Sequence, residues 1–203
     1  GATYRALEFS GSTVENMTVA SRMTIANMAI EAGAKCALFT PDEKTAEYCE
    51  IELNDYQKSL KGDEDAKYLR TITYRAEDFV PVMACPSQVD KIRDTSVLEG
   101  TPIDQVFIGS CTNGRLEDLQ AAAEVLKGKK VAKGLRVIII PATQKIYLQA
   151  MEEGLLKTFI EAGAVVSTPT CGPCLGGYMG ILAAGEKCVS TTNRNFVGRM
   201  GHV

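Results

Sequence analysis

The sequence predicts an α/β fold with a mostly parallel sheet, because short apolar segments alternate with longer amphipathic ones through its second half. The apolar segments are rich in Val and Ile, as in residues 135–143, and this is typical of strands buried on both faces. The longer segments, such as 115–128, show the helical spacing of apolar residues. A length of 203 residues, 45% of them hydrophobic, suffices for one large or two small domains with a real core.

The first domain is expected over residues 1–84. A mostly apolar helix is predicted over 15–34, where Gly33 ends it. A second helix is predicted to follow Thr40 as its N-cap, with Pro41 at the first helical position. The remaining predictions are a strand over 36–39, a loop over 54–65 and a strand over 68–74.

The second domain is expected over residues 103–203, after a charged linker over 85–102. Each strand is followed by a helix, so the strands should be parallel. The strands are predicted at 103–110, 135–143, 164–168 and 186–192. The helices are predicted at 115–128, at 144–163 and, in short form, up to Leu182. Thr112 and Asn113 are expected to cap the first of these helices.

Composition and charge exclude several classes of function. The net charge of −3 and the pI of about 5.4 imply no basic face, so nucleic acid is not an expected partner. No apolar run approaches the roughly 18 residues of a membrane helix, and no signal peptide is recognised, so no membrane contact is expected. The odd number of cysteines, seven, argues against a disulfide framework and favours a reducing, cytoplasmic location.

Unusual side chains follow three of the predicted strands of the second domain. Cys111 comes just after the first strand, and Cys171 and Cys174 follow the third in a Cys-Gly-Pro-Cys turn. Asn193 and Arg194 follow the last strand. The carboxyl ends of parallel strands share one edge of a sheet, and ligands bind outside that edge. We therefore expect these three loops to form one site.

The cysteines allow four interpretations. A redox-active pair at Cys171 and Cys174 would make the protein a thioredoxin-like disulfide oxidoreductase, although such a protein needs no third cysteine at the same edge. A zinc-binding structural module would need a fourth ligand, and His202 is the only histidine. Cys36 and Cys188 lie within strand patterns and are expected to pack as small hydrophobic side chains. Three thiolates without a fourth ligand suit an iron–sulfur cluster with one open iron.

Three motifs together resemble the aconitase superfamily. They are IGSCTNGRLEDL at 108–119, PTCGPCLGG at 169–177 and STTNRNFVGRMG at 190–201. The resemblance covers essentially the whole chain and implies aconitase-like α/β/α domains in three layers, with a mostly parallel sheet. It also implies a [4Fe-4S] cluster, with Cys111, Cys171 and Cys174 as its ligands.

The resemblance further implies the residues that act on a substrate. Asn193, Arg194 and Arg199 fall on the substrate-binding motif, and guanidinium groups suit carboxylates because each can bind one bidentately. Asn27 and Glu31 match residues near the open iron and its bound water, with Asn27 on the substrate and Glu31 in a catalytic role. The plain alternatives are an exposed basic turn for the arginines and a solvated helix pair for Asn27 and Glu31.

The implied activity is that of a hydro-lyase, which isomerises an α-hydroxy dicarboxylic or tricarboxylic acid by dehydration and rehydration. The chain looks most similar to the branch that converts 2-isopropylmalate to 3-isopropylmalate in leucine biosynthesis, or that acts on homocitrate or dimethylmalate. In that branch the swivelling domain is a separate small subunit, so a small-subunit partner is expected. The family's N-terminal part, with its Asp-His motif, is expected to lie outside this sequence, and the chain alone is expected to be inactive.

Overall fold

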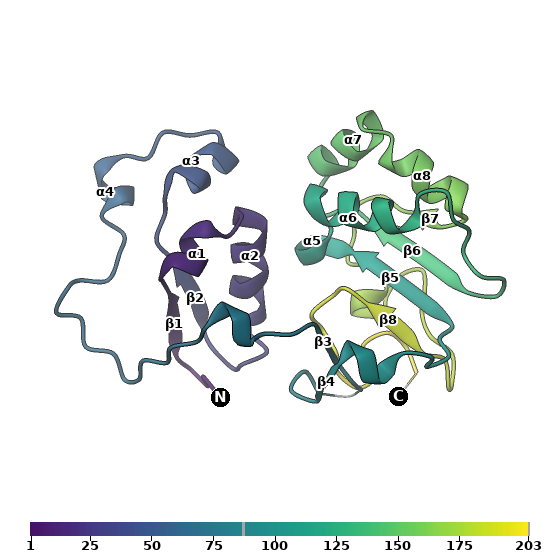
Figure 1. Ribbon diagram of the computed structural model, residues 1–203, viewed down its shortest axis with the longest axis horizontal. Coiled ribbons are helices and arrows are strands. Elements are labelled where there is room, and N and C mark those ends of the chain that lie inside the picture. The colour runs from purple at the N-terminus through teal and green to yellow at the C-terminus, as the bar shows by residue number, and fades with distance from the viewer. Residues whose placement is uncertain (87, 203) are drawn as a thin grey trace. The chain divides into compact units, whose positions relative to one another are not determined.

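The computed structural model describes residues 1–86 and 88–202 and divides the chain into two units. The first unit is Gly1–Val80, and the second unit is Pro81–Val203. Each unit contains parallel strands together with helices (Figure 1). The α/β fold class that the sequence predicts is therefore confirmed.

The first unit is built around two short parallel strands, β1 (Ala6–Phe9) and β2 (Cys36–Phe39). The chain leaves β1, forms α1 (Ser12–Asn16) and α2 (Val19–Met28), and returns as β2, against which α2 packs (Figure 1). The later elements are α3 (Glu43–Cys49), α4 (Asp55–Lys58) and the 3-10 helix η1 (Ala76–Asp78). The strand predicted over 36–39 is thus confirmed.

Two helix predictions for this unit are wrong in detail. The helix predicted over 15–34 is interrupted, because Thr18 acts as the N-cap of α2 and accepts a hydrogen bond from the Ser21 N–H at 3.1 Å. The next helix begins after Asp42 rather than Thr40. The Asp42 carboxylate accepts a hydrogen bond from the backbone N–H three residues later, at 3.0 Å, and so satisfies the helix start.

The strand predicted over residues 68–74 does not form. Residues 61–80 are all exposed, and this segment finds no strand to pair with in the described part of the unit. A strand needs a neighbour for its backbone N–H and C=O groups, which an alternating sequence alone does not supply. The loop predicted over 54–65 contains the short helix α4, because the Asn54 side chain accepts a hydrogen bond from the Gln57 N–H at 2.8 Å.

Arg22 joins the helices of the first unit. Its side chain is only 5% exposed, and one guanidinium nitrogen lies 2.7 Å from Asp42 Oδ2. The same guanidinium donates hydrogen bonds to the carbonyl oxygens of Val14 and Glu15, at 3.2 and 3.1 Å. Because arginine offers several N–H donors in one plane, a single buried side chain holds α2 against α1 and the start of α3.

We expect the first unit to lose stability in acid through Asp42. The hydrogen bond from Arg22 holds the pKa of the Asp42 carboxyl at about 2, below its usual 3.8. A lowered folded-state pKa gives stability that is complete above about pH 4 and is lost as the pH falls through about 2. Solvent screening of this partly exposed group reduces the contribution to about 1 kcal/mol. Urea unfolding over that range should show the loss, and Asp42→Asn should abolish it; an unchanged pH slope in the variant would refute the assignment.

The second unit is built around a sheet of parallel strands in the spatial order β7-β6-β5-β8 (Figure 1). The strands are β5 (Gln105–Gly109), β6 (Arg136–Ile140), β7 (Val165–Val166) and β8 (Cys188–Ser190). The helices are α5 (Ser110–Asn113), α6 (Leu116–Leu126), α7 (Gln144–Glu152), α8 (Leu155–Ala162) and the 3-10 helix η3 (Gly172–Leu175). All four predicted strands are confirmed, each shorter than expected.

The segment predicted as a linker, 85–102, has secondary structure. It holds β4 (Ile92–Asp94), which pairs antiparallel with β3 (Val82–Ala84), and the 3-10 helix η2 (Thr95–Leu98). The hairpin belongs to the second unit. The domain limits at 1–84 and 103–203 stay predictions.

The two faces of the four-stranded sheet belong to different cores. One core packs the sheet against α6, α7 and α8, and Leu119 and Phe159 are completely buried in it. The other contains Phe107, Ile140 and Cys174, which brings η3 onto the second face. Because β6 contributes alternate residues to both cores, its sequence is a continuous run of apolar residues.

Glycine sets two helix ends that the apolar pattern does not reveal. The helix predicted over 144–163 is two helices, because Gly154 adopts a left-handed φ of 75° between α7 and α8. The short helix predicted up to Leu182 is limited to η3, because Gly176 follows it with a φ of 74°. Within the described residues, no helix is long and apolar enough to cross a membrane.

Candidate functional site

The carboxyl ends of β5 and β8 mark the candidate site. The chain passes from β5 to β6 on one side, whereas β8 pairs with β5 on the other. The order of the strands therefore reverses between β5 and β8, and in open parallel sheets ligands bind at such a point. Cys111 follows β5, and the loop of residues 191–199 follows β8.

The turn that carries Cys111 is held very close to the end of β6. Gly109 has a φ of 111°, and a Cβ atom added there would lie 2.0 Å from the Ile140 carbonyl oxygen. The Gly109 N–H donates to the Thr191 hydroxyl oxygen at 2.9 Å, and the Asn113 side-chain amide donates to the Thr191 carbonyl oxygen. These contacts fix the turn after β5 to the loop after β8.

The prediction that Thr112 and Asn113 cap α6 is wrong. Both residues lie within α5, where Thr112 is buried. The helix begins after Arg115, whose N–H donates to Asp118 Oδ2 at 2.9 Å. The acceptor thus comes from the first turn of the helix itself, and partial burial raises the pKa of this Asp118 carboxyl.

The Cys-Gly-Pro-Cys turn forms η3 directly on the sheet. The Cys174 N–H donates to the Cys171 carbonyl oxygen at 3.1 Å. Gly172 has a φ of 55°, and a Cβ atom there would lie 2.4 Å from Ile140 Cδ1. This close packing buries Cys174, whereas Cys171 and Cys111 are exposed. One predicted ligand is therefore anchored in the core, and the other two are accessible.

The loops after β7 and β8 meet at Cys174. Burial raises the pKa of the Cys174 thiol, the Arg199 guanidinium and hydrogen bonds with Arg199 and Thr192 oppose that rise, and a smaller electrostatic effect of Cys111 adds to it. The hydrogen bonds require Arg199 and Thr192 to lie beside Cys174. The structure thus brings Cys174 and Arg199 together, and Cys111 follows β5 at the same edge of the sheet.

Arg199 packs against the turn that follows η3. A Cβ atom on Gly176 would lie 2.9 Å from the Arg199 carbonyl oxygen, so a glycine there lets the two loops touch. The Nε of Arg199 is buried and has no hydrogen-bond partner among the described residues. An unpaired buried N–H is costly, and a ligand carboxylate would satisfy it. Asn193 and Arg194 lie half-buried in the same loop.

Sequence reasoning missed the residues that hold this loop in place. The Asn195 side chain donates to the carbonyl oxygens of Ala84 and Cys85, at 3.2 and 2.8 Å, and so fastens the loop to the β3–β4 hairpin. Thr191 and Thr192 bind the turns that carry Cys111 and Cys174, as described above. Their only signal in the sequence is the polar run Ser-Thr-Thr-Asn-Arg-Asn at 190–195.

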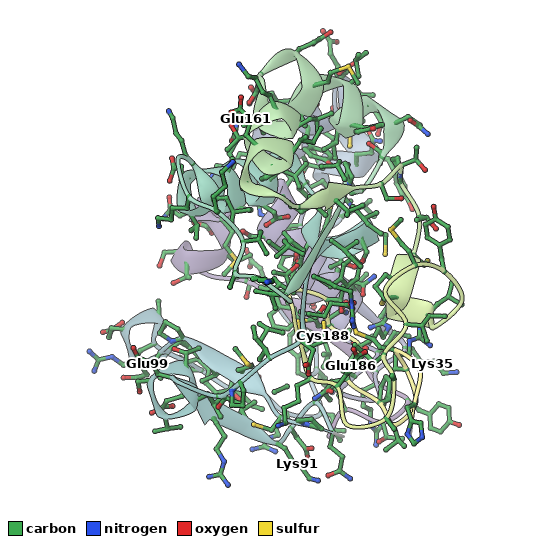
Figure 2. The ribbon with its side chains drawn as sticks, turned by 90° about the vertical axis from the view of Figure 1, so that its right-hand side faces the viewer. Lys35, Lys91, Glu99, Glu161, Glu186 and Cys188 are labelled. Atoms are coloured by element: carbon green, nitrogen blue, oxygen red, sulfur yellow. The ribbon has the colours of Figure 1, made fainter. Side chains whose placement is uncertain are left out.

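A polar network holds the opposite end of the same strands, around Glu186 (Figure 2). Glu186 accepts two hydrogen bonds from the Arg136 guanidinium, both at 2.7 Å. Arg136 Nε donates to Gln105 Oε1 at 3.0 Å, and Gln105 Nε2 donates to the Gly180 carbonyl oxygen at 2.8 Å. Because Gln105 is completely buried, this network fixes the segment between η3 and β8 to the sheet.

Comparison with known proteins decides the family. A sequence profile of the aconitase family (aconitate hydratase) matches residues 1–96 and 87–203. The chain belongs to the aconitase family. It is 57% identical to the 3-isopropylmalate dehydratase large subunit of Halothermothrix orenii, 55% to that of Thermodesulfovibrio yellowstonii and 54% to large subunit 1 of Pyrococcus abyssi. Each match covers 100% of this chain and 48% of the relative, so the chain spans about half the length of these relatives.

The donor set of this aconitase-family chain fits a cluster better than a single metal ion. Among the described residues, no three His, Cys, Asp or Glu side chains gather closely enough to hold one ion. A cluster places each cysteine on a different iron, so its ligands need not converge on one point. The Arg199 guanidinium lies beside Cys174, so it would offset the negative charge of a thiolate there.

Asn27 and Glu31 both lie in the first unit of the aconitase-family chain. Asn27 is half-buried in the last turn of α2, but Glu31 lies beyond the end of that helix at Met28. The helix predicted over 15–34 would have held both residues, and this part of that prediction is wrong. The Glu31 N–H donates to the Met28 carbonyl oxygen at 3.0 Å in a tight turn, and Gly33, with a φ of 81°, continues the reversal toward β2. The roles of Asn27 and Glu31 toward substrate stay predictions.

Proposed function

We propose that the chain holds the [4Fe-4S] cluster of a hydro-lyase that dehydrates and rehydrates an α-hydroxy dicarboxylic acid. The observation that carries the proposal is the buried Nε of Arg199, which lacks a partner among the described residues, on a guanidinium beside Cys174 at the sheet edge where Cys111 follows β5. A cluster needs thiolates and a carboxylate substrate needs a guanidinium, and both kinds of group are present at this one edge. The names of the relatives support the same class of reaction.

In this proposal Cys111, Cys171 and Cys174 hold the cluster. Cys174 is fixed by its burial, and the two exposed thiols bind from the adjacent loops. The bound cluster supplies an open iron, which acts as a Lewis acid toward a hydroxyl group. Each thiol must lose its proton to bind iron. The cationic Arg199 beside Cys174 stabilises the thiolate and so favours binding of the cluster.

Asn193, Arg194 and Arg199 bind the substrate in this proposal. The buried Nε of Arg199 needs an acceptor, and a carboxylate oxygen provides one. Because Arg194 and Arg199 lie on one loop, each can take one carboxylate of a dicarboxylic acid and so fix its orientation. We assign Asn27 to a hydrogen bond with the substrate and Glu31 to proton transfer at the departing hydroxyl group.

We propose 2-isopropylmalate, converted to 3-isopropylmalate in leucine biosynthesis, as the substrate, with homocitrate and dimethylmalate as alternatives. The names of the relatives favour the first of these acids. The words "large subunit" in those names also support a separate small subunit as the partner. We propose a cytoplasmic location, because seven cysteines without a disulfide framework suit a reducing compartment. Because the chain spans about half of these relatives, we expect it to be inactive alone.

A dehydration assay that follows the ultraviolet absorbance of the unsaturated acid tests the proposed function. The chain is loaded with iron and sulfide and assayed alone, then together with a small subunit and the half of the Halothermothrix orenii relative that it does not match. We expect no turnover by the chain alone, and dehydration of 2-isopropylmalate in preference to homocitrate and dimethylmalate by the assembly. Turnover by the chain alone would contradict its expected inactivity. An assembly that dehydrates none of the three acids would overturn the proposed function.

A further inference from the structure

The first unit has almost no core of its own. All of residues 1–80 are described, and the buried ones are Ala20, Arg22, Ala29 and Ala34. An alanine side chain removes little apolar surface from water, whereas a stable domain of this size must bury several large side chains. The second unit, by contrast, completely buries Phe, Leu and Ile side chains. The first unit therefore lacks a layer that would cover it.

One face of the β1–β2 sheet is uncovered. Along β2, Ala37 and Phe39 are half-buried on one face, whereas Cys36 and Leu38 lie on the other face and are exposed. Leu38, which is 53% exposed, pairs with Glu8 of β1. The expectation that Cys36 packs as a small hydrophobic residue is wrong, because Cys36 is exposed and no residue that the structure describes covers its face. Parallel sheets are almost always covered on both faces.

The segment 61–80 adds a second exposed apolar surface beside that face. The Tyr68 hydroxyl donates to Glu8 Oε2 at 2.7 Å, which ties the segment to the uncovered face. Leu69 is 79% exposed and Phe79 is 66% exposed, and every residue of the segment is exposed. Figure 1 shows the chain after α4 as a long open loop. Proteins rarely leave so many large apolar side chains together in water unless another protein covers them.

Both edges of the β1–β2 pair are also open, since these two strands form a sheet of their own in the first unit. Open edges present unpaired N–H and C=O groups, and two strands alone are only marginally stable. The unit thus lacks both neighbouring strands and a covering layer. The relatives that match the whole chain are about twice as long, so they contain enough further sequence to supply both.

We infer that the uncovered face of β1–β2 and the segment 61–80 form a docking surface for the half of an aconitase-family large subunit that this chain does not span. That half covers Leu38 and Leu69 with apolar side chains and extends the parallel sheet at its open edges. The inference rests on family membership and packing, and it goes beyond the proposed reaction.

Co-expression tests the docking surface without cluster or substrate. The tagged full chain is expressed with the half of the Halothermothrix orenii relative that it does not match, and hydrogen exchange is measured for the chain alone and for the purified complex. Leu38→Lys and Leu69→Lys place a charge on the surface. The first of these keeps the fold, because the lysine pairs with Glu8 across the strands. Val125→Lys on α6, where Val125 is 63% exposed, is the matched control.

We expect a complex in which the amides of residues 61–80 exchange at least about tenfold more slowly than in the chain alone. Leu38→Lys and Leu69→Lys should each raise the dissociation constant at least about tenfold, and Val125→Lys should leave it unchanged. Absence of a complex, or surface variants that bind as tightly as the wild type, would overturn the inference. Amides of 61–80 that are already protected in the chain alone would overturn it too, because the chain's second unit or a second copy would then cover them. None of these results depends on the proposed reaction.

Discussion

Replacing Gly109 with alanine is expected to lower the free energy of unfolding of the second unit by more than about 3 kcal/mol. The φ of 111° at Gly109 is one that residues with a side chain rarely adopt, and the new Cβ atom would lie 2.0 Å from the Ile140 carbonyl oxygen. Both atoms are fixed to the backbone of adjacent strands, so neither can rotate away. The ends of β5 and β6 must separate, and Cys111 is displaced with them.

Gly134→Ala is the matched control for this prediction, because Gly134 has a φ of 89° and open space around it. It introduces backbone strain without a clash, so we expect a loss of about 1 kcal/mol. Urea unfolding followed by circular dichroism measures both losses. Equal losses of unfolding free energy in the two variants would show that the close contact with Ile140 does not make glycine necessary at position 109.

The second large effect is expected for Arg199→Ala, which should lower kcat/KM of the assembled enzyme about 10²–10³-fold. The buried Nε of Arg199 has no acceptor within residues 1–86 and 88–202, and the guanidinium lies beside Cys174. A substrate carboxylate bound there loses a charge-assisted hydrogen bond when the side chain is removed. Arg199→Lys retains the charge but loses the planar pair of donors, so it should recover only part of the activity.

Lys157→Ala controls for the loss of a cation, because the Lys157 side chain is 77% exposed on α8 and should leave kcat/KM unchanged. Iron content is measured in every variant, because Arg199 also lies next to Cys174. A variant Arg199→Ala that carries a full cluster and keeps kcat/KM within about threefold of wild type would exclude Arg199 from substrate binding.

The second unit could be predicted well because its signals are local. The strand β6 lies between two cores, so its apolar run is visible in the sequence. The three cysteines, Asn193 and Arg194 could be assigned to one edge because parallel strands direct their following loops to the same side. Arg199 is implied only by the family resemblance, and the structure places its side chain beside Cys174.

Features that depend on distant contacts could not be predicted in this way. The Thr191 hydroxyl, just after β8, accepts a hydrogen bond from the Gly109 N–H at the end of β5. Asn195 binds a hairpin more than one hundred residues earlier in the sequence. No local pattern marks either contact. Residues 68–74 show the opposite case, because a strand pattern is present and the described part of the chain offers it no neighbouring strand. If the docking surface is correct, the missing neighbour comes from the half that the relatives contain and this chain does not.

Anaerobic reconstitution with iron and sulfide tests the central claim most directly. Bound iron, bound sulfide and visible absorption are measured for the wild type and for the triple variant Cys111→Ser, Cys171→Ser and Cys174→Ser. The matched control carries Cys36→Ser, Cys49→Ser and Cys85→Ser and keeps the three proposed ligands. We expect an oxygen-labile cluster in the wild type and the control and none in the first triple variant. A folded wild-type chain that binds no cluster, or a first triple variant that binds as much iron and sulfide as the wild type, would contradict the proposed cluster site.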